Sequence, residues 1–126
     1  MNVLSSILKW IGTQLTPTQV THSITRSSGA TLNSNTKFVK CGKIVNAQLG
    51  VNVYSTEVAA GGNIFVGTLN TPSLLPAGSA RFTTYLGQRI LVGNINPSGN
   101  IIIRNSSSTP LTITSELILV GIYMTE

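Results

Sequence analysis

The sequence contains no aspartate, and its 126 residues include only three glutamates, one histidine and one cysteine. Most enzyme chemistry needs carboxylates, imidazoles or thiolates that lie close together. A paired-carboxylate site would need two of Glu57, Glu116 and Glu126, and Glu126 is the last residue given. A catalytic triad would have to be built around His22, with Glu57 or Glu116 to orient it. We therefore expect no catalysis, no metal site and no cofactor.

Charge is also scarce, at 9% of residues against roughly 25% in typical soluble domains. Serine, threonine, asparagine and glycine carry the polar load instead. The net charge of +5 would suit a polyanionic partner, but only Lys37, Lys40 and Lys43 form a loose cluster. There is no arginine-rich arm, and no aromatic residue alternates with basic ones. The pattern favours ordinary solubilising charge, and we expect no nucleic-acid partner.

Cysteine and long hydrophobic runs are both nearly absent. The single Cys41 excludes an intrachain disulfide and a cysteine-based zinc site, and its neighbours Val39 and Val45 suggest a small buried hydrophobic residue. No apolar run approaches the roughly 18 residues of a membrane span. No basic segment followed by an unbroken apolar stretch marks a signal peptide. We expect a protein made in a cytoplasm, without membrane insertion.

The N-terminal segment, residues 1–17, predicts a short amphipathic helix. Leu4, Leu8, Ile11 and Leu15 are spaced four, three and four residues apart, as in a coiled-coil seam. Thr16-Pro17 should end the helix. Two heptads are too short to be stable alone, so the helix should pack on its own domain, on sister chains or on a membrane surface.

Residues 18–35 are rich in Thr, Ser and Asn and suggest a linker with one strand, Gln19–Thr25. Residues 36–126 predict a β domain. Its clearest strand is Lys43–Ser55, where Val45, Ala47, Leu49, Val51 and Val53 alternate strictly with polar residues or glycine. The other expected strands are Lys37–Cys41, Asn63–Leu69, Arg81–Leu86, Arg89–Asn94, Asn100–Arg104 and Leu111–Met124. About eight antiparallel strands of this spacing predict an all-β sandwich or jelly roll.

The last predicted strand is apolar on both faces through Leu117, Ile118, Leu119, Val120 and Ile122. A strand buried on both faces needs a second sheet on one side and another chain on the other. Together with the N-terminal seam, this favours an oligomer, and a homotrimer fits both features.

Four segments resemble the C-terminal receptor-binding or fibre-tip domains of tail proteins from phages of Gram-positive and gut bacteria. They read FVKCGKIVNAQLGVNV, GTLNTPSLLPAG, ILVGNINPSGNIIIRN and LILVGIYMTE, and they fall between Thr36 and Glu126. The chain departs from the usual Leu-Pro step, where it has Leu69-Asn70-Thr71-Pro72. The resemblance implies a homotrimeric jelly roll, located in a virion, that binds host cell-surface saccharide.

Saccharides are usually bound by aromatic faces together with amides and hydroxyls. Asn52, Tyr54, Tyr85 and Arg89 are the candidates for such a site, and Asn52 and Tyr54 share the polar face of the long strand. A simpler interpretation of each residue is a solvent-facing strand position or an interchain contact.

Several functions remain open from the sequence. The first is a structural virion protein, such as a phage tail-tip, fibre or head-fibre component that binds host saccharide. The alternative is a small jelly-roll capsid or capsid-decoration protein without ligand binding, although its first thirty residues carry only Lys9 and Arg26 as cations. A secreted lectin-like or TNF-like module would need a signal peptide. An enzyme is the most remote of the four.

Overall fold

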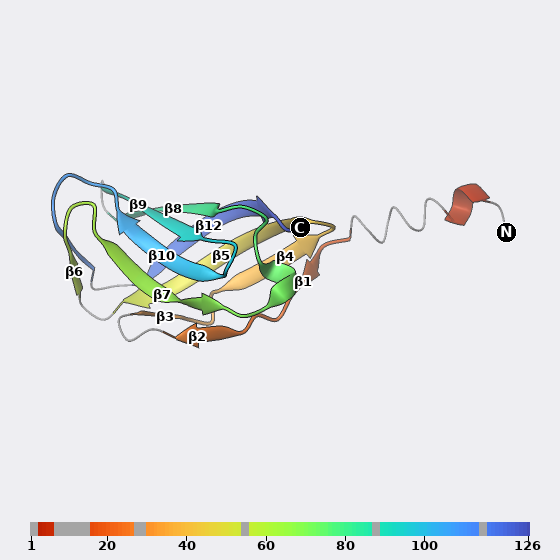
Figure 1. Ribbon diagram of the computed structural model, residues 1–126, viewed down its shortest axis with the longest axis horizontal. Helices are drawn as coiled ribbons and strands as arrows, with labels where there is room; N and C mark the ends of the chain where they lie inside the picture. Colours follow the sequence, from red (N-terminus) through yellow and green to blue (C-terminus); the bar gives the residue numbers. More distant parts are fainter. Residues whose placement is uncertain (1–2, 7–15, 27–29, 54–55, 87–88, 114–115) are drawn as a thin grey trace.

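The structure, a computed structural model, describes residues 3–6, 16–26, 30–53, 56–86, 89–113 and 116–126 (Figure 1). Val3 to Ser6 are helical, and the rest of the described chain is β structure with one 3-10 turn. The elements are β1 (Thr18–Gln19), β2 (Ile24–Arg26), β3 (Ala30–Leu32), β4 (Lys37–Cys41), β5 (Ile44–Val53), β6 (Thr56–Val58), β7 (Asn63–Leu69), η1 (Pro72–Leu74), β8 (Ala80–Leu86), β9 (Arg89–Ile95), β10 (Asn100–Asn105), β11 (Leu111–Ile113) and β12 (Leu117–Met124).

Ten of these strands form one antiparallel sheet. Nine follow the order β1-β4-β5-β12-β8-β9-β10-β7-β2, and β3 pairs with β5 beyond the end of β4. The sheet curls, so that β2 and β3 lie side by side although they are far apart in this order (Figure 1). The remaining strands, β6 and β11, pair with each other. The predicted all-β sandwich is confirmed.

The core lies inside the curled sheet. The five apolar residues predicted to point inward from the long strand are all buried, from Val45 to Val53. Phe38, Phe82, Leu91, Ile101, Ile103 and Leu119 fill the space between the strands and are almost completely shielded from solvent. Alternation therefore predicted the buried face of β5 correctly, because every second side chain of a strand points the same way.

Tyr123 ties the C-terminal strand to η1. Its ring meets Phe82 edge-on at 6.2 Å, and its hydroxyl donates to the Leu74 carbonyl at 2.6 Å. Burial raises the pKa of Tyr123, so the phenol stays protonated and keeps donating. This bond satisfies a buried polar group in an otherwise apolar region.

The turn Asn96-Pro97-Ser98-Gly99 forms as predicted between β9 and β10. The Gly99 amide donates to the Asn96 carbonyl at 2.8 Å, and the Asn96 side chain accepts from the amides of Ser98 and Asn100. Gly99 has a φ of 91°, a conformation that glycine adopts easily.

The predicted number of strands is wrong: the described residues contain twelve rather than about eight. Residues 18–35 supply three of them, and the predicted strand Gln19–Thr25 is not continuous, since β1 ends at Gln19 and β2 begins at Ile24. All three pair within the main sheet. The predicted strand Leu111–Met124 is two strands, β11 and β12, that belong to different sheets.

The predicted N-terminal seam lies mostly outside the described residues. Leu4 belongs to the short helical stretch and is exposed, whereas Leu8, Ile11 and Leu15 are not described. Among the residues that the structure places, no helix has the length and apolar character needed to cross a membrane.

Candidate functional site

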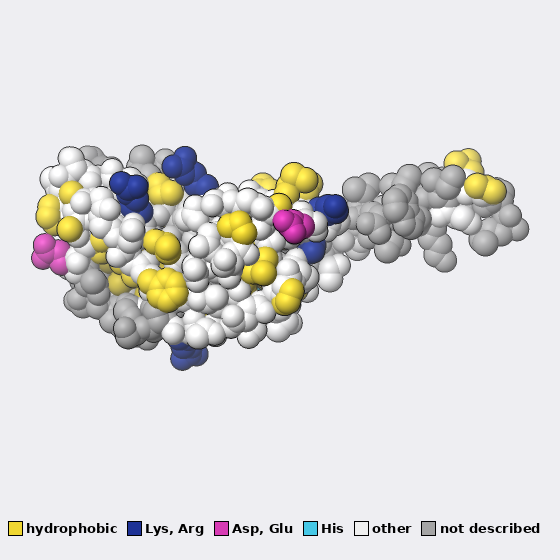
Figure 2. All heavy atoms as spheres, viewed as in Figure 1, with side chains coloured by type: hydrophobic (Ala, Val, Ile, Leu, Met, Phe, Trp, Pro, Cys, Tyr) yellow, Lys and Arg dark blue, Asp and Glu magenta, His cyan; other side chains and the backbone are white. Residues whose placement is uncertain are grey.

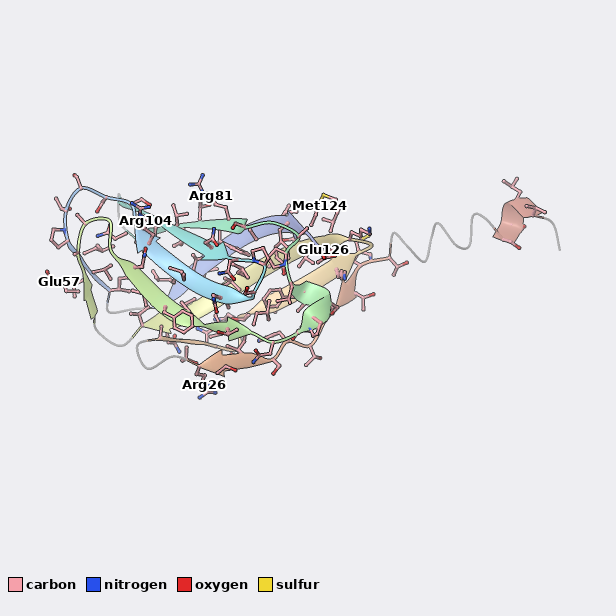
Figure 3. The ribbon with its side chains drawn as sticks, in the orientation of Figure 1. Arg26, Glu57, Arg81, Arg104, Met124 and Glu126 are labelled. Carbon is pink, nitrogen blue, oxygen red and sulfur yellow. The ribbon has the colours of Figure 1, made fainter. Side chains whose placement is uncertain are left out.

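The outward face of β12 carries a row of exposed apolar side chains. Leu117, Leu119 and Tyr123 point into the core, while Ile118, Val120 and Ile122 point out. Ile122 is 69% exposed and Met124 60% exposed, and Met124 projects away from the sheet in Figure 3. The outer stripe, as we call it, consists of Ile118, Val120, Ile122 and Met124 with Ile44 of β5, which is opposite Met124 in the register.

Within a single chain only the inner face of β12 is buried, and burial of the outer face by another chain stays a prediction. The stripe is about one strand wide, because most of the outward-facing residues beside it on the adjacent strands are polar. Asn46 and Gln48 of β5 lie opposite Ile122 and Val120, and Thr83 of β8 lies opposite Val120 on the other side. Long exposed apolar side chains in a row are typical of protein contact surfaces.

A cluster of amides and one carboxylate lies where β12 begins. The Asn33 side-chain amide donates to Asn52 Oδ1 at 3.1 Å and to Glu116 Oε2 at 2.5 Å. The Asn35 amide donates to both Glu116 oxygens, at 3.0 and 3.2 Å. We call Asn33, Asn35, Asn52 and Glu116 the amide cluster. Its hydrogen bonds are exposed to solvent, so the groups can also exchange partners with a ligand.

The loop between β3 and β4 holds this cluster against the outer side of β5. Thr36 Oγ1 accepts from the Gly50 amide at 3.0 Å and donates to the Gly50 carbonyl at 3.2 Å. A Cβ on Gly50 would lie 2.2 Å from Asn33 Oδ1 and 2.9 Å from the Asn35 Cβ. Only glycine at position 50 lets the loop approach this closely.

The predicted saccharide residues come from strands that end near one another. Asn52 joins the amide cluster, one residue before the end of β5. Tyr85 and Arg89 belong to β8 and β9, and their side chains, like the whole of Tyr54, lie outside the described residues. Because Thr83 pairs with Val120, the end of β8 runs toward the start of β12. The opposite end of the sheet carries β1 and the C-terminus (Figure 1).

Sequence reasoning missed Asn33 and Asn35, and it considered Glu116 as a possible carboxylate of a catalytic site. The partners of Glu116 in the structure are amides. The only local signal was two asparagines in a turn-rich stretch, Asn33-Ser34-Asn35. Their contact with Glu116 spans more than 80 positions of the chain, so spacing along the sequence could not reveal it.

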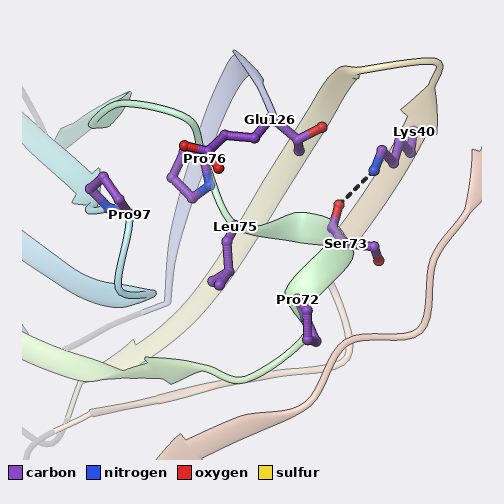
Figure 4. A pocket seen from close by; sticks show the side chains of 8 residues that line it. Lys40, Pro72, Ser73, Leu75, Pro76, Pro97 and Glu126 are labelled. Atoms are coloured by element: carbon purple, nitrogen blue, oxygen red, sulfur yellow. Dashed lines mark hydrogen bonds between the residues drawn. The ribbon is translucent and has the colours of Figure 1, made fainter.

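A cavity of about 210 Å³ lies at the end that carries the C-terminus (Figure 4). Its walls are largely proline and leucine, from Pro72, Leu75, Pro76 and Pro97, with Lys40 and Glu126 at the rim. Lys40 Nζ donates to the Ser73 carbonyl at 2.7 Å and so holds η1 against β4. This bond gives Lys40 a structural role, and the two rim charges are of opposite sign.

A second cavity, of about 180 Å³, lies between β2 and β3 and is lined by His22, Ile24, Arg26, Thr31 and Leu32. His22 is half-buried, and its ring packs on Phe38 at 5.3 Å. Burial lowers the pKa of His22, so the imidazole is mainly neutral near pH 7. Among the described residues, no three metal-binding side chains come together around His22 or elsewhere.

The basic residues do not gather into a patch on the face seen in Figure 2. The side chains of Arg81 on β8 and Arg26 on β2 project from opposite sides of the molecule (Figure 3). This distribution agrees with the expectation of scattered solubilising charge.

The fold is similar to that of a phage receptor-binding domain of known structure. The chain is similar to the crystal structure of the head domain of lactococcal phage bIL170, with a TM-score of 0.58 and 16% sequence identity. The match covers 85% of this chain and 99% of that domain. The predicted resemblance is therefore confirmed for the fold. No known protein family matches the sequence, and no curated protein does either.

Proposed function

We propose that this chain is a virion protein that forms a homotrimer and attaches the particle to saccharide on the host surface. The observation that carries the proposal is the outer stripe, an uncovered apolar row on a fold similar to a phage receptor-binding head domain. Attachment by binding alone also agrees with the scarcity of acidic residues and histidine, and we propose that the chain has no catalytic activity.

Three copies could bury the outer stripe around a common axis. The stripe is about one strand wide. Where three copies meet at an axis, each copy contributes only a narrow strip to the contact, so apolar surface beside the stripe is not required. Val120 and Ile122, which are 53% and 69% exposed, would form its centre. Removing these side chains from water would favour association by about 25 cal/mol for each Å² of apolar surface buried.

The end with the amide cluster is the proposed attachment end. Amide donors and carboxylate acceptors match the hydroxyls of a saccharide. The opposite end carries β1, and with it the chain that leads to the N-terminal segment. An N-terminal helix that binds other virion proteins would leave the amide cluster free to face the host.

The direct test is attachment of fluorescently labelled protein to whole host cells. We expect Asn52→Ala and Tyr85→Ala each to reduce attachment by about tenfold or more, since three weak sites act together in a trimer. Gln19→Ala is the matched control, because it removes an exposed residue of β1 at the opposite end and should bind as the wild type does.

The mass of each variant in solution should remain that of the wild type. If the Asn52→Ala and Tyr85→Ala variants both bind cells as the wild type does, the proposal that this end attaches to saccharide is wrong. A small capsid or decoration protein without ligand binding would then describe the chain better.

A further inference from the structure

The cleft between β2 and β3 lies where the curled sheet closes on itself. β2 pairs with β7, and β3 pairs with β5, so the two strands lie side by side without forming a ladder with each other. The gap between them is the cavity of about 180 Å³. None of its described lining residues belongs to the outer stripe or the amide cluster, although the cleft adjoins that cluster: Leu32 directly precedes Asn33, and Thr31 is opposite Asn52 in the strand register.

The lining of the cleft combines a cation with neutral polar donors. Arg26 is exposed and presents several N–H donors in a planar fork, and Thr31 supplies a hydroxyl. His22 is held in place by Phe38 and offers a ring nitrogen, which can donate in either protonation state. None of the described residues that line the cleft is acidic. Ile24 and Leu32 form the apolar remainder of its walls.

This set of donors fits a small oxyanion better than a neutral sugar. An arginine fork matches the two oxygens of a phosphate or carboxylate, and such charge-assisted hydrogen bonds are stronger than neutral ones. A cation would meet Arg26, with no carboxylate among the described lining residues to balance it. The cleft has room for one phosphate or carboxylate group with part of the molecule that carries it.

We propose that the cleft of His22, Arg26 and Thr31 binds an oxyanion, a phosphate or carboxylate group. The inference deepens the proposed attachment role and rests on it only for the origin of the anion, which would be a substituent of a surface polymer. A free anion from solution has the same chemistry, so the test must separate these two sources.

The chain has a single histidine, so the imidazole signals of untagged protein report on His22 alone. Inorganic phosphate, glucose 1-phosphate and glucose are titrated separately at constant pH and ionic strength, and the His22 proton shifts are followed by NMR. We expect saturable shifts with both phosphates and none with glucose. Binding of inorganic phosphate without binding of glucose 1-phosphate would support an oxyanion site, and would assign it to a free anion.

Arg26→Gln should weaken the binding of inorganic phosphate and of glucose 1-phosphate by about tenfold or more, because a hydrogen bond to a charged group is lost. Arg81→Gln is the matched control: it removes the same charge from an exposed strand position on the opposite side of the molecule and should leave binding unchanged (Figure 3).

The absence of a saturable His22 shift would overturn the proposal, and so would equal affinities in Arg26→Gln and Arg81→Gln. Because these titrations use free anions, their failure is independent of cell attachment. Loss of cell attachment in the Asn52 and Tyr85 variants with no phosphate binding would leave the attachment role intact and remove the oxyanion site alone.

Discussion

Gly99 holds the β9–β10 turn in a conformation that other residues rarely adopt. Its φ is 91°, and a Cβ there would lie 2.2 Å from the Leu69 carbonyl oxygen. Gly99→Ala should therefore destabilise the fold by about 2 kcal/mol or more, measured by urea denaturation. Gly78→Ala is the control, because an added Cβ there meets nothing within 4 Å. Equal midpoints for the two variants would contradict this account of the turn.

The protonation of His22 should respond to what fills its cleft. Burial lowers its pKa from the ordinary 6.5, while β3 and β4 contribute the neutral Thr31, Leu32 and Phe38 around it. Among the described residues that line the cleft, Arg26 alone is charged. In chloride, an NMR titration should give a midpoint below 6.5, and saturating phosphate should raise it, because an anion favours the imidazolium.

The sign of the stability effect follows from the same shift. Since the folded-state pKa is below the unfolded one, the unfolded chain takes up a proton more readily. Without phosphate, His22 should contribute to stability above pH 6.5 and lose that contribution as the pH falls through the folded-state pKa. A thermal midpoint that falls no further on acidification in the wild type than in His22→Phe would count against this.

At the scale of the elements, Asn105 joins β10 to the smaller sheet. Its buried amide donates to the carbonyls of Val58, Ala59 and Thr109 at 3.0–3.3 Å, and its oxygen accepts twice from Ser107. Asn105→Ala would leave one buried and two partly buried carbonyls without this donor, at a cost of about 3 kcal/mol.

Calorimetry or chemical denaturation should show this loss for Asn105→Ala, whereas Asn63→Ala, at an exposed position of the paired strand, should cost less than about 0.5 kcal/mol. If Asn105→Ala also lost less than about 0.5 kcal/mol of stability, Asn105 would not be needed to hold β6 and β11 in place.

The longer strands could be predicted from the sequence because alternation and turn residues mark them. Lys37–Cys41 and Asn63–Leu69 are observed with the predicted bounds. The strands β1, β2, β3 and β6 have only two or three residues each, too few to show a period of two. The apolar residues from Leu111 to Met124 do not show where β11 ends and β12 begins, because strands from two different sheets can follow one another closely in sequence.

The candidate sites were predictable only in part. Asn52 was found because it shares the polar face of β5, but its partners Asn33 and Glu116 are brought to it by the β3–β4 loop and by pairing of β12 with β5. The cleft between β2 and β3 depends on how the sheet curls, which no local pattern encodes.

At the scale of the whole molecule, the outer stripe is the feature of the fold on which the proposed assembly and attachment depend. A chain that exposes Ile44, Val120, Ile122 and Met124 in one row should associate, and the amide cluster would then be repeated on each copy. Repetition multiplies weak saccharide contacts, which is how small attachment domains reach useful affinity. Trimer formation is therefore the claim on which the proposed function most depends.

Sedimentation equilibrium of the full chain at micromolar concentration tests it most directly, with Ile122→Lys as the variant and Phe65→Lys, an exposed apolar position on β7, as the control. The account predicts three times 13.3 kDa for the wild type and the control, and a mass falling toward 13.3 kDa for Ile122→Lys. A lysine ammonium enclosed in an apolar contact would lose its hydration. A wild type that remains at 13.3 kDa, or an Ile122→Lys variant with the mass of a trimer, would contradict assembly through this face.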